Sequence, residues 1–543
     1  MPQTVPAYRK EIDGLRAIAV LSVVLCHAGF MTFSGGFVGV DVFFVISGYL
    51  ITSIIYRELS SGNFSLLKFY ERRVKRILPA LFAMLLFSWL FAWLCLWPAD
   101  FRSFSKGLPF VSWFGANIHF QHEIGYFDPD VALRPLLHTW SLGVEEQYYL
   151  LFPFLLMLMF RFGKIGILLC LAVISMVSLF AAQFWLSRNS SAVFYFLPFR
   201  AWELLIGAIY ALVSIDSAGL FHRMRRKTRS VLGCIGILAI LVAVVMYSEK
   251  TPFPGLSALL PTLGALLIIA TAQPDTLPGK LLSIPPMQAI GLWSYSIYLW
   301  HQPVFAFTRY QIDKPTPALM AGMIALTLVL SYASWRWVEI PLRQRQWPQK
   351  AIWLRALAGI LFFSIIGILG KSDKDYFKRF APDYLSELTI EKKLDRNYGL
   401  DRHCDSPDIG SRCQTANNPD TLVWGDSYAM HIVPGIIASQ PDIKLIQRTM
   451  SACGPLLNIA PILNNNLRAA EACLHFNAAV MQRLPTWTTI KWVALSSKLT
   501  QYLGEGVQVL STDGRPGCPT CPRRWTCSTP PRCSSNPCPT ARR

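Results

Sequence analysis

Residues 79–97 read PALFAMLLFSWLFAWLCLW, an apolar run without a charged side chain. A helix needs about 20 mostly apolar residues to cross the hydrocarbon core of a membrane, so this run predicts a transmembrane helix. The residues directly before it, 72–78, read RRVKRIL. Arginine and lysine accumulate on the cytoplasmic side of membrane helices, so we expect this helix to start at the cytoplasmic face.

Further apolar runs lie on both sides of this one and bring the number of candidate spans to eleven. Two of them are unusually polar, because one contains Glu145 and Glu146 and another contains His301. The pattern predicts a multi-pass α-helical membrane protein with about 10 core helices and one linking helix. The ten additional runs are residues 12–32, 37–56, 143–160, 165–186, 193–213, 231–247, 256–272, 287–307, 318–339 and 352–370.

The composition of the whole chain agrees with this interpretation. It is 53% hydrophobic and 15% charged, whereas soluble domains carry about 25% charged residues, which argues against a large soluble enzyme and a disordered chain. The net charge is +19, and segments 57–78 and 214–230 hold eleven Lys and Arg residues between them. This distribution fits cytoplasmic loops better than a nucleic-acid-binding surface. With the N-terminus inside, eleven spans place the C-terminal segment outside.

We expect four parts along the chain, with changes of composition after residue 370 and at residue 515. We expect a membrane domain at 1–345, a linking transmembrane helix at 346–372, an outer domain at 373–514 and an atypical tail rich in Cys, Pro and Arg at 515–543. No cleavable signal peptide is expected, because Asp13 and Arg16 stand at the head of the first span.

Four cysteines fall in the expected outer domain, where an oxidising compartment favours disulfides. Pairing of sequence neighbours, Cys404 with Cys413 and Cys453 with Cys473, is one of three connectivities. The CxxC motif that starts at Cys518 lacks a second pair at zinc-ribbon spacing, so no metal site is expected.

The outer domain also carries an α/β pattern. A short apolar run from residue 421 ends in Gly425-Asp426-Ser427, and a helical pattern follows. This predicts a strand–turn–helix with Ser427 at the turn, where helix N-terminal amides favour developing negative charge. Further strands are expected at 443–447, 492–497 and 507–511 with helices between them, which favours a parallel sheet.

Ionisable side chains inside the predicted spans are candidates for function, since they are costly in a membrane. Arg16 and His27 are eleven residues apart in the first span, which puts them on one helix face about 16 Å apart. Asp41 is a third such residue, in the glycine-rich start of the second span. Arg73 and Arg76 share one helical face, and arginine binds phosphate groups by bidentate hydrogen bonds.

Several stretches together resemble the membrane-bound acyltransferase 3 family, in matching order over about residues 8–345. They are YRKEIDGLRA at 8–17 followed by His27, GFVGVDVFFVISGYL at 36–50, RVKRILP at 73–79, TWSLGVEEQY at 139–148, YSIYLWHQP at 295–303 and VEIPLR at 338–343. This resemblance implies an enzyme that takes an acyl group, usually acetyl, from cytoplasmic acyl-CoA. It implies delivery to a sugar hydroxyl outside the bacterial inner membrane, with the outer domain in the periplasm.

The resemblance also suggests roles for individual residues. Arg16 and His27 match one functional motif of the family, and Arg73 and Arg76 match another, so we expect the arginines to bind acyl-CoA. His27 is the expected general base, because a histidine can take the proton of a sugar hydroxyl; alternatively it carries the acyl group itself. Glu145 is expected to orient His27 or to bind the acceptor, and His301 is a second candidate.

The Gly425-Asp426-Ser427 turn resembles the first motif of SGNH-type esterases and acyltransferases, a domain fused to acyltransferase 3 units in O-antigen O-acetyltransferases. Cys453 and Cys473 also resemble those fused domains. In that family Ser427 would be the acyl-carrying nucleophile. No Asp-x-x-His motif follows Ser427 here, and His475 is the only later histidine. A serine without a base is a weak nucleophile, so we expect this domain to be truncated or altered at its end.

The first hypothesis is therefore a membrane O-acyltransferase that uses acetyl-CoA or another acyl-CoA. Its expected partners are membrane lipids and an envelope polysaccharide or lipid-linked glycan such as the lipopolysaccharide O-antigen, without nucleic acid. Two alternatives stay open: a multi-pass transporter with an outer binding domain, and an esterase that acts through Ser427.

Overall fold

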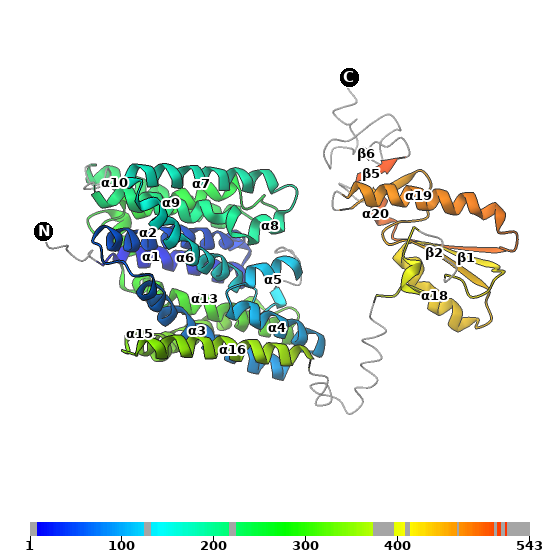
Figure 1. The fold of residues 1–543 in the computed structure, drawn as a ribbon, viewed down its shortest axis with the longest axis horizontal. Helices are drawn as coiled ribbons and strands as arrows, with labels where there is room; N and C mark the ends of the chain where they lie inside the picture. The colour runs from blue at the N-terminus through cyan, green and yellow to red at the C-terminus, as the bar shows by residue number, and fades with distance from the viewer. Residues whose placement is uncertain are drawn as a thin grey trace, which may run out of the picture. The chain divides into compact units, whose positions relative to one another are not determined.

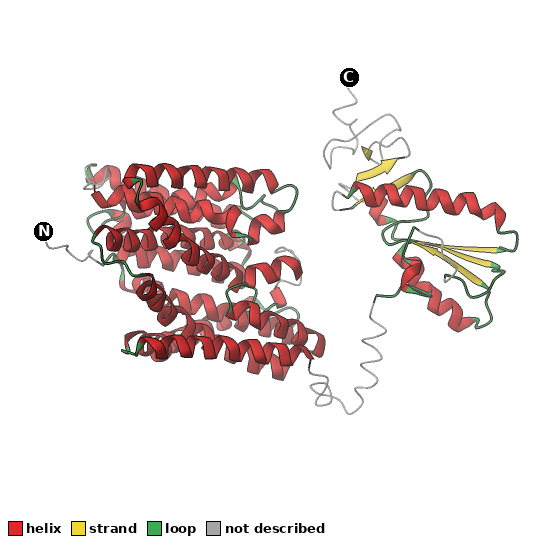
Figure 2. Ribbon diagram, in the orientation of Figure 1, coloured by secondary structure: helices red, strands yellow, loops and turns green. Residues whose placement is uncertain are grey.

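The chain forms two compact units, residues 1–377 and 378–543. The structure, a computed structural model, describes residues 8–123, 132–216, 224–372, 396–407, 413–463, 466–503, 508–511 and 516–517. The first unit is a bundle of helices, and the second combines strands and helices (Figures 1 and 2). Most of the tail predicted at 515–543 lies outside the described residues.

Each of the eleven predicted spans coincides with a helical segment of the first unit, and 193–213 covers both α8 and α9. The helix α3, which contains the apolar run 79–97 up to Cys95, starts after Ser65, whose hydroxyl accepts a hydrogen bond from the Lys68 amide. The helices are α1 (Lys10–His27), α2 (Gly39–Ser60), α3 (Leu66–Cys95), α4 (Pro98–Ser112), α5 (Ala116–Glu123), α6 (Thr139–Phe160), α7 (Gly163–Trp185), α8 (Ser190–Tyr195), α9 (Leu197–Asp216), α10 (Arg226–Met246), α11 (Leu259–Thr271), α12 (Leu277–Leu282), α13 (Pro285–Gln311), α14 (Pro317–Ala333), the π-helix Ser334–Glu339, α15 (Ile340–Gln344) and α16 (Gln349–Ser372).

Among the described residues, seven helical segments are long and apolar enough to cross a membrane. They are Gly36–Ser60, Leu66–Cys95, Gly163–Trp185, Ser190–Ile215, Arg226–Met246, Pro317–Gln344 and Gln349–Lys371. The other four predicted spans lie in α1, α6, α11 and α13. The apolar helix Leu256–Thr271, which contains α11, is shorter than these seven segments. The helices α1, α6 and α13 hold ionisable groups that face the interior of the bundle, such as Arg16, Glu145 and His301. The fold is that of a multi-pass α-helical membrane protein.

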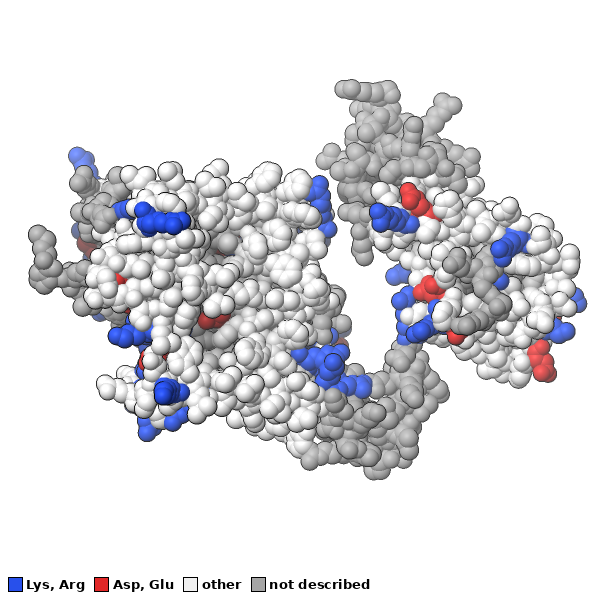
Figure 3. Space-filling view, in the orientation of Figure 1, with Lys and Arg blue, Asp and Glu red and all other residues white. Residues whose placement is uncertain are grey.

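Close helix packing at glycines positions the centre of the bundle. The helix α2 packs along α9, and α1 lies between α2 and α13. At Gly48 of α2, a Cβ would stand 1.8 Å from the Leu204 carbonyl oxygen of α9, so only glycine permits this contact. On the face that Figure 3 shows, most Lys and Arg side chains of this unit lie toward its two ends, and the surface between them is largely uncharged.

The second unit contains two small sheets. In the first, β1 (Thr421–Gly425) lies between β2 (Leu445–Thr449) and β4 (Trp492–Ser496), all parallel, as predicted. The prediction was wrong for 507–511: β5 (Gln508–Ser511) pairs antiparallel with β3 (Ile459–Ile462) in a separate sheet. The remaining elements are α18 (Ser427–Ser439), α19 (Leu467–Arg483), α20 (Thr500–Leu503) and β6 (Pro516–Gly517).

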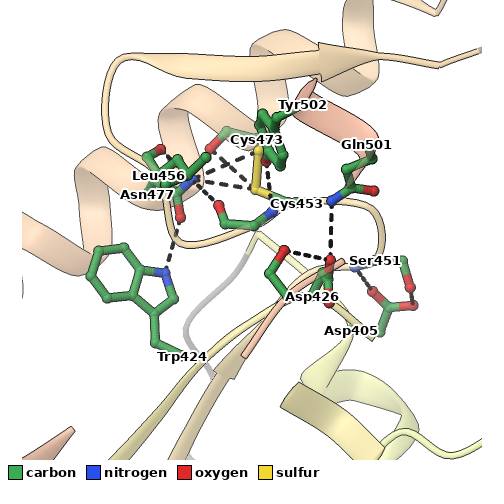
Figure 4. Close-up of a disulfide and its surroundings, with 12 residues drawn as sticks. Asp405, Trp424, Asp426, Ser451, Cys453, Leu456, Cys473, Asn477, Gln501 and Tyr502 are labelled. Atoms are coloured by element: carbon green, nitrogen blue, oxygen red, sulfur yellow. Dashed lines mark hydrogen bonds between the residues drawn. A yellow bond between two sulfur atoms is a disulfide. The ribbon is translucent and has the colours of Figure 1, made fainter. Parts of the chain in front are cut away.

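Two disulfides stabilise this unit. Cys404 pairs with Cys413 and Cys453 with Cys473, which confirms the pairing of sequence neighbours. The second disulfide borders a polar core in which Asn477 accepts a hydrogen bond from the Trp424 indole (2.9 Å) and donates one to the Gly454 carbonyl (2.8 Å) (Figure 4). This network joins α19 to β1 and to the loop after β2.

Candidate active site

A cavity of about 170 Å³ lies inside the first unit. It brings together four of the residues singled out from the sequence: Arg16 of α1, Arg73 and Arg76 of α3, and Glu145 of α6. The remaining lining residues are Val40, Phe43, Phe44, Ile46, Ser47, Leu50, Ile51, Ile54, Ile77, Ser141, Leu142, Glu146, Tyr149, Ser294, Tyr295 and Tyr298. The cavity is thus an apolar chamber with a few convergent charged groups, which is the usual composition of a ligand site.

Three arginines face the cavity together with two glutamates, and the arginines differ in their contacts. Within the described part of the chain, the guanidinium groups of Arg73 and Arg76 form no close ion pair or hydrogen bond, although nearby glutamate carboxylates interact with them electrostatically. Arg73 lies over the Tyr149 ring, 5.0 Å from its centroid. Arg16 makes only a long contact with Asp13, at 3.4 Å. These groups are available to bind an anion such as a phosphate, which guanidinium binds through paired hydrogen bonds.

The two carboxylates of the cavity differ in their surroundings. Glu145 accepts hydrogen bonds from the Ser47 hydroxyl and from the Tyr149 hydroxyl, the latter at 2.6 Å. The Oε1 atom of its neighbour Glu146 is buried and has no hydrogen-bond partner in the described structure. The expectation that Glu145 orients His27 is not met, because the carboxylate binds these two hydroxyls instead.

His27 lies away from this cavity, in a cluster with two other histidines. Its Nδ1 is 3.0 Å from Nε2 of His301, the second histidine candidate, and the two rings are stacked. The His301 ring is fully buried, and its centroid is 5.3 Å from that of His138. Arg309 donates a hydrogen bond to the carbonyl oxygen of His27 (2.5 Å), which fixes the end of α1 on α13.

The hydrogen bonds of His301 define the proton positions of the pair. Its Nδ1 faces the carbonyl oxygen of Ile297 at 3.3 Å. A carbonyl can only accept, so this nitrogen carries the hydrogen and Nε2 of the neutral ring is an acceptor. Nε2 then accepts from Nδ1–H of His27. The remaining nitrogen of His27, Nε2, is therefore unprotonated and can act as a base.

Sequence reasoning missed His138, which stands directly before α6. Its side chain is buried, and neither ring nitrogen has a hydrogen-bond partner among the described residues. Its backbone carbonyl accepts a hydrogen bond from the Tyr298 hydroxyl at 2.9 Å. The available signal was its position, because His138 immediately precedes the TWSLGVEEQY stretch.

Sequence reasoning also missed the partners of Asp41. Arg200 of α9 forms ion pairs with Asp41 (3.0 Å) and with Glu203 (3.1 Å), and all three side chains are buried. The guanidinium also lies 5.4–5.7 Å from the centroids of four aromatic rings, those of Phe44, Trp140, Phe194 and Phe253. The signal was an Arg-x-x-Glu pair inside the apolar run 193–213. This cluster connects α2 to α9 and is separate from the histidine cluster.

In the second unit, Ser427 is the first residue of α18, and only Asp426 separates it from the end of β1. The turn is fixed by Asp426, which caps the helix through the Tyr428 amide and accepts a further hydrogen bond from the Ser497 hydroxyl. The His431 ring binds the backbone carbonyl of Ser427. Within the described residues, no histidine forms a hydrogen bond with the Ser427 hydroxyl, and His475 is exposed on α19.

Comparisons with known proteins agree with this arrangement. The model of the family described as "Acyltransferase domain" matches residues 9–336. The model described as "SGNH domain (fused to AT3 domains)" matches residues 396–518. No solved structure matches the chain.

Three relatives illustrate the similarity. The chain is 32% identical over 403 residues to the peptidoglycan O-acetyltransferase OatA of Listeria monocytogenes, covering 67% of this chain and 63% of the relative. It is 32% identical to the O-acetyltransferase OatA of Staphylococcus aureus (63% and 58% covered) and 31% identical to the putative peptidoglycan O-acetyltransferase YrhL of Bacillus subtilis (67% and 62% covered). The matches thus span about three fifths of each relative. The first family model covers more than half of this sequence, so the chain belongs to the acyltransferase 3 family and carries a fused SGNH domain.

Proposed function

We propose that this protein is a membrane O-acetyltransferase that moves an acetyl group from acetyl-CoA, or another acyl group from its CoA thioester, to a hydroxyl group of an envelope glycan. The observation that carries the proposal is the cavity with three arginines, of which Arg73 and Arg76 have no ion-pair partner among the described residues. The printed names of the relatives, which are O-acetyltransferases, support the reaction type.

The arginines serve as the donor site. The phosphates of CoA bind Arg73 and Arg76, with Arg16 as a third cation in the same cavity. Arg16 and His27 are separated along α1 by about 16 Å. The extended pantetheine arm of CoA spans this interval and brings the thioester to the histidine pair. By the positive-inside rule, this cavity opens toward the cytoplasm, with the N-terminus inside and the second unit in the periplasm of a bacterial inner membrane.

His27 acts as the general base. Its unprotonated Nε2 takes the proton of the sugar hydroxyl while the hydroxyl oxygen forms a bond to the acyl carbon. The bond from that carbon to sulfur then breaks, and the proton passes to the departing thiolate, which leaves as CoA thiol. The positive charge that forms on His27 is shared with His301 through the 3.0 Å hydrogen bond. The alternative, in which His27 itself carries the acyl group, uses the same nitrogen.

The first transfer is assigned to the membrane unit alone. Ser427 has the position of an SGNH nucleophile, but no described histidine reaches its hydroxyl, and without a base a serine is a weak nucleophile. Ser427 is therefore given no part in this transfer.

The test is the O-acetyl content of isolated envelope polysaccharides, measured by mass spectrometry in cells that express the chain or its variants. We expect acetylation with the wild-type chain and a loss of at least about 100-fold with His27→Ala. The exposed His403, in the second unit, supplies the control His403→Ala. The acceptor is identified by whether the acetylated fragments come from peptidoglycan or from lipopolysaccharide O-antigen. Absence of acyl groups from every glycan, or full acetylation with His27→Ala, contradicts the proposal.

A further inference from the structure

A second cavity, of about 150 Å³, lies at the end of the first unit where α3 ends and α4 begins. Its walls come from α4, α5, the segment before α6 and the end of α13. In Figure 1, α4 and α5 lie at the right end of the bundle and α15 at the left end. Its lining includes Asp100, Ser103, Phe104, Phe120, Arg134 and Tyr310.

The two cavities lie at different levels of the same helices. Along α13, Tyr298 lines the first cavity and Tyr310 the second, about 18 Å further on, with His301 between them. The chain before and along α6 shows the same order, because Leu136 lines the second cavity, His138 follows, and Ser141 lines the first. The histidine cluster therefore stands between the two cavities.

The second cavity is lined by one negatively charged residue, Asp100, and one positively charged residue, Arg134. The Asp100 carboxylate accepts a hydrogen bond from the Tyr310 hydroxyl at 2.7 Å. Arg134 donates one to the Ser103 hydroxyl at 2.5 Å. In the described structure, Asp100 and Arg134 thus contact these two hydroxyls and form no ion pair with each other. A carboxylate and a guanidinium that are not neutralised by each other can accept from and donate to neighbouring hydroxyl groups of one ligand.

The apolar part of the second cavity is partly aromatic. Phe104 and Phe120 contribute to its lining, and both side chains are buried. The negative face of an aromatic ring attracts the slightly positive C–H groups on the face of a sugar ring. A pyranose presents such C–H faces together with hydroxyl groups at its edge. This combination of charged and aromatic groups fits a sugar better than a lipid chain, which has no hydroxyl groups for Asp100 and Arg134.

One hydrogen bond and one sequence neighbour connect the wall of this cavity to the histidines. Gln302, the residue after His301, donates a hydrogen bond to the Arg134 carbonyl at 3.1 Å. His138, two residues after Leu136, is buried with both ring nitrogens unpartnered in the described structure. A buried polar group without a partner is destabilising, and a hydroxyl of a bound ligand would supply the missing hydrogen bond.

We propose that the second cavity binds the acceptor, a hexopyranose unit of a glycan, so that donor and acceptor reach the histidine cluster from opposite ends of the bundle. The inference rests on the proposed function, since it assigns the acceptor's place in that reaction. Asp100 and Arg134 hold hydroxyls of the sugar, and Phe104 and Phe120 contact its ring. The hydroxyl to be acylated points toward His138 and His27.

The test measures sugar binding separately from catalysis. The full chain in lipid nanodiscs is titrated by calorimetry with N,N′-diacetylchitobiose and with methyl α-glucopyranoside, the first representing amino-sugar glycans and the second neutral glycans. We expect at least one of them to bind. Asp100→Asn and Arg134→Gln should each weaken that binding at least about 10-fold, while CoA binding, which reports correct folding, stays within twofold. The control Lys314→Gln changes an exposed residue between α13 and α14 and should leave both affinities unchanged.

Two results would overturn the acceptor site. One is that neither sugar binds the wild-type chain; the other is that the sugar binds Asp100→Asn and Arg134→Gln as tightly as wild type. Arg73→Gln should show the opposite pattern, in which CoA binding is weaker and sugar binding is unchanged. A loss of sugar binding in Arg73→Gln would also contradict the assignment of donor and acceptor to separate cavities. The proposed transferase activity is judged by the His27→Ala acetylation experiment, so either idea can fail while the other holds.

Discussion

Replacing His301 by leucine tests whether the histidine pair works as one unit. His301 touches His27 through one hydrogen bond of 3.0 Å and lies outside the arginine cavity, so the change should act on the chemical step and spare donor binding. Leucine leaves Nδ1–H of His27 without an acceptor and removes the group that shares the positive charge formed during transfer. A hydrogen bond to a charged group contributes about 1.5–3 kcal/mol. Since about 1.4 kcal/mol corresponds to a factor of ten in rate, kcat should fall about 10- to 150-fold.

The assay is steady-state transfer of radiolabelled acetyl groups from acetyl-CoA to a glycan fragment by the purified full chain. The KM for acetyl-CoA should stay within about twofold of wild type, which a general loss of folding would not produce. His301→Gln provides an oxygen that can accept from His27, so it should recover kcat to within about 10-fold of wild type. A wild-type kcat for His301→Leu, or equal losses for leucine and glutamine, would refute the reasoning from the hydrogen-bonded pair.

Three further predictions concern other parts of the chain. Arg76→Gln should raise the KM for acetyl-CoA about 10- to 100-fold, because one charge-assisted hydrogen bond is lost; an unchanged KM removes Arg76 from the donor site. Ser427→Ala should leave CoA release within twofold of wild type, and a collapse of CoA release would place Ser427 in the first step. Replacing both Cys453 and Cys473 by serine opens a loop with a sequence separation of 20, which should lower the free energy of unfolding of the second unit by about 3 kcal/mol in a denaturant titration. An unchanged unfolding midpoint would contradict that last estimate.

The sequence predicted the helices of the membrane unit well, because the length of an apolar run is a local property. It also singled out Arg16, Arg73, Arg76 and Glu145, which the fold brings to one cavity. The motif pattern could not show that Arg16 and His27 belong to different sites along α1. It named His301 as a candidate without its contact to His27, because the two residues are 274 positions apart.

The residues that sequence analysis missed have physical reasons for being missed. His138 stands alone just before a helix, and no spacing pattern marks it. Arg200 and Glu203 lie inside a run that was interpreted by its average hydrophobicity, which conceals two charges facing inward. In the second unit, the strand at 507–511 was found, but its partner was not, since the pairing of β5 with β3 depends on chain segments almost fifty residues apart.

The buried cluster of Asp41, Arg200 and Glu203 has a consequence for how the protein is made. Asp41 enters the bilayer with α2, but its partner on α9 is synthesised 159 residues later. An unpaired aspartate in the membrane costs up to about 3 kcal/mol on insertion scales. During synthesis the Asp41 carboxylate therefore lacks its ion-pair partner until Arg200 of α9 has been made. A chain that ends before α9 therefore carries an uncompensated carboxylate in α2, whereas the complete bundle neutralises it with a buried arginine.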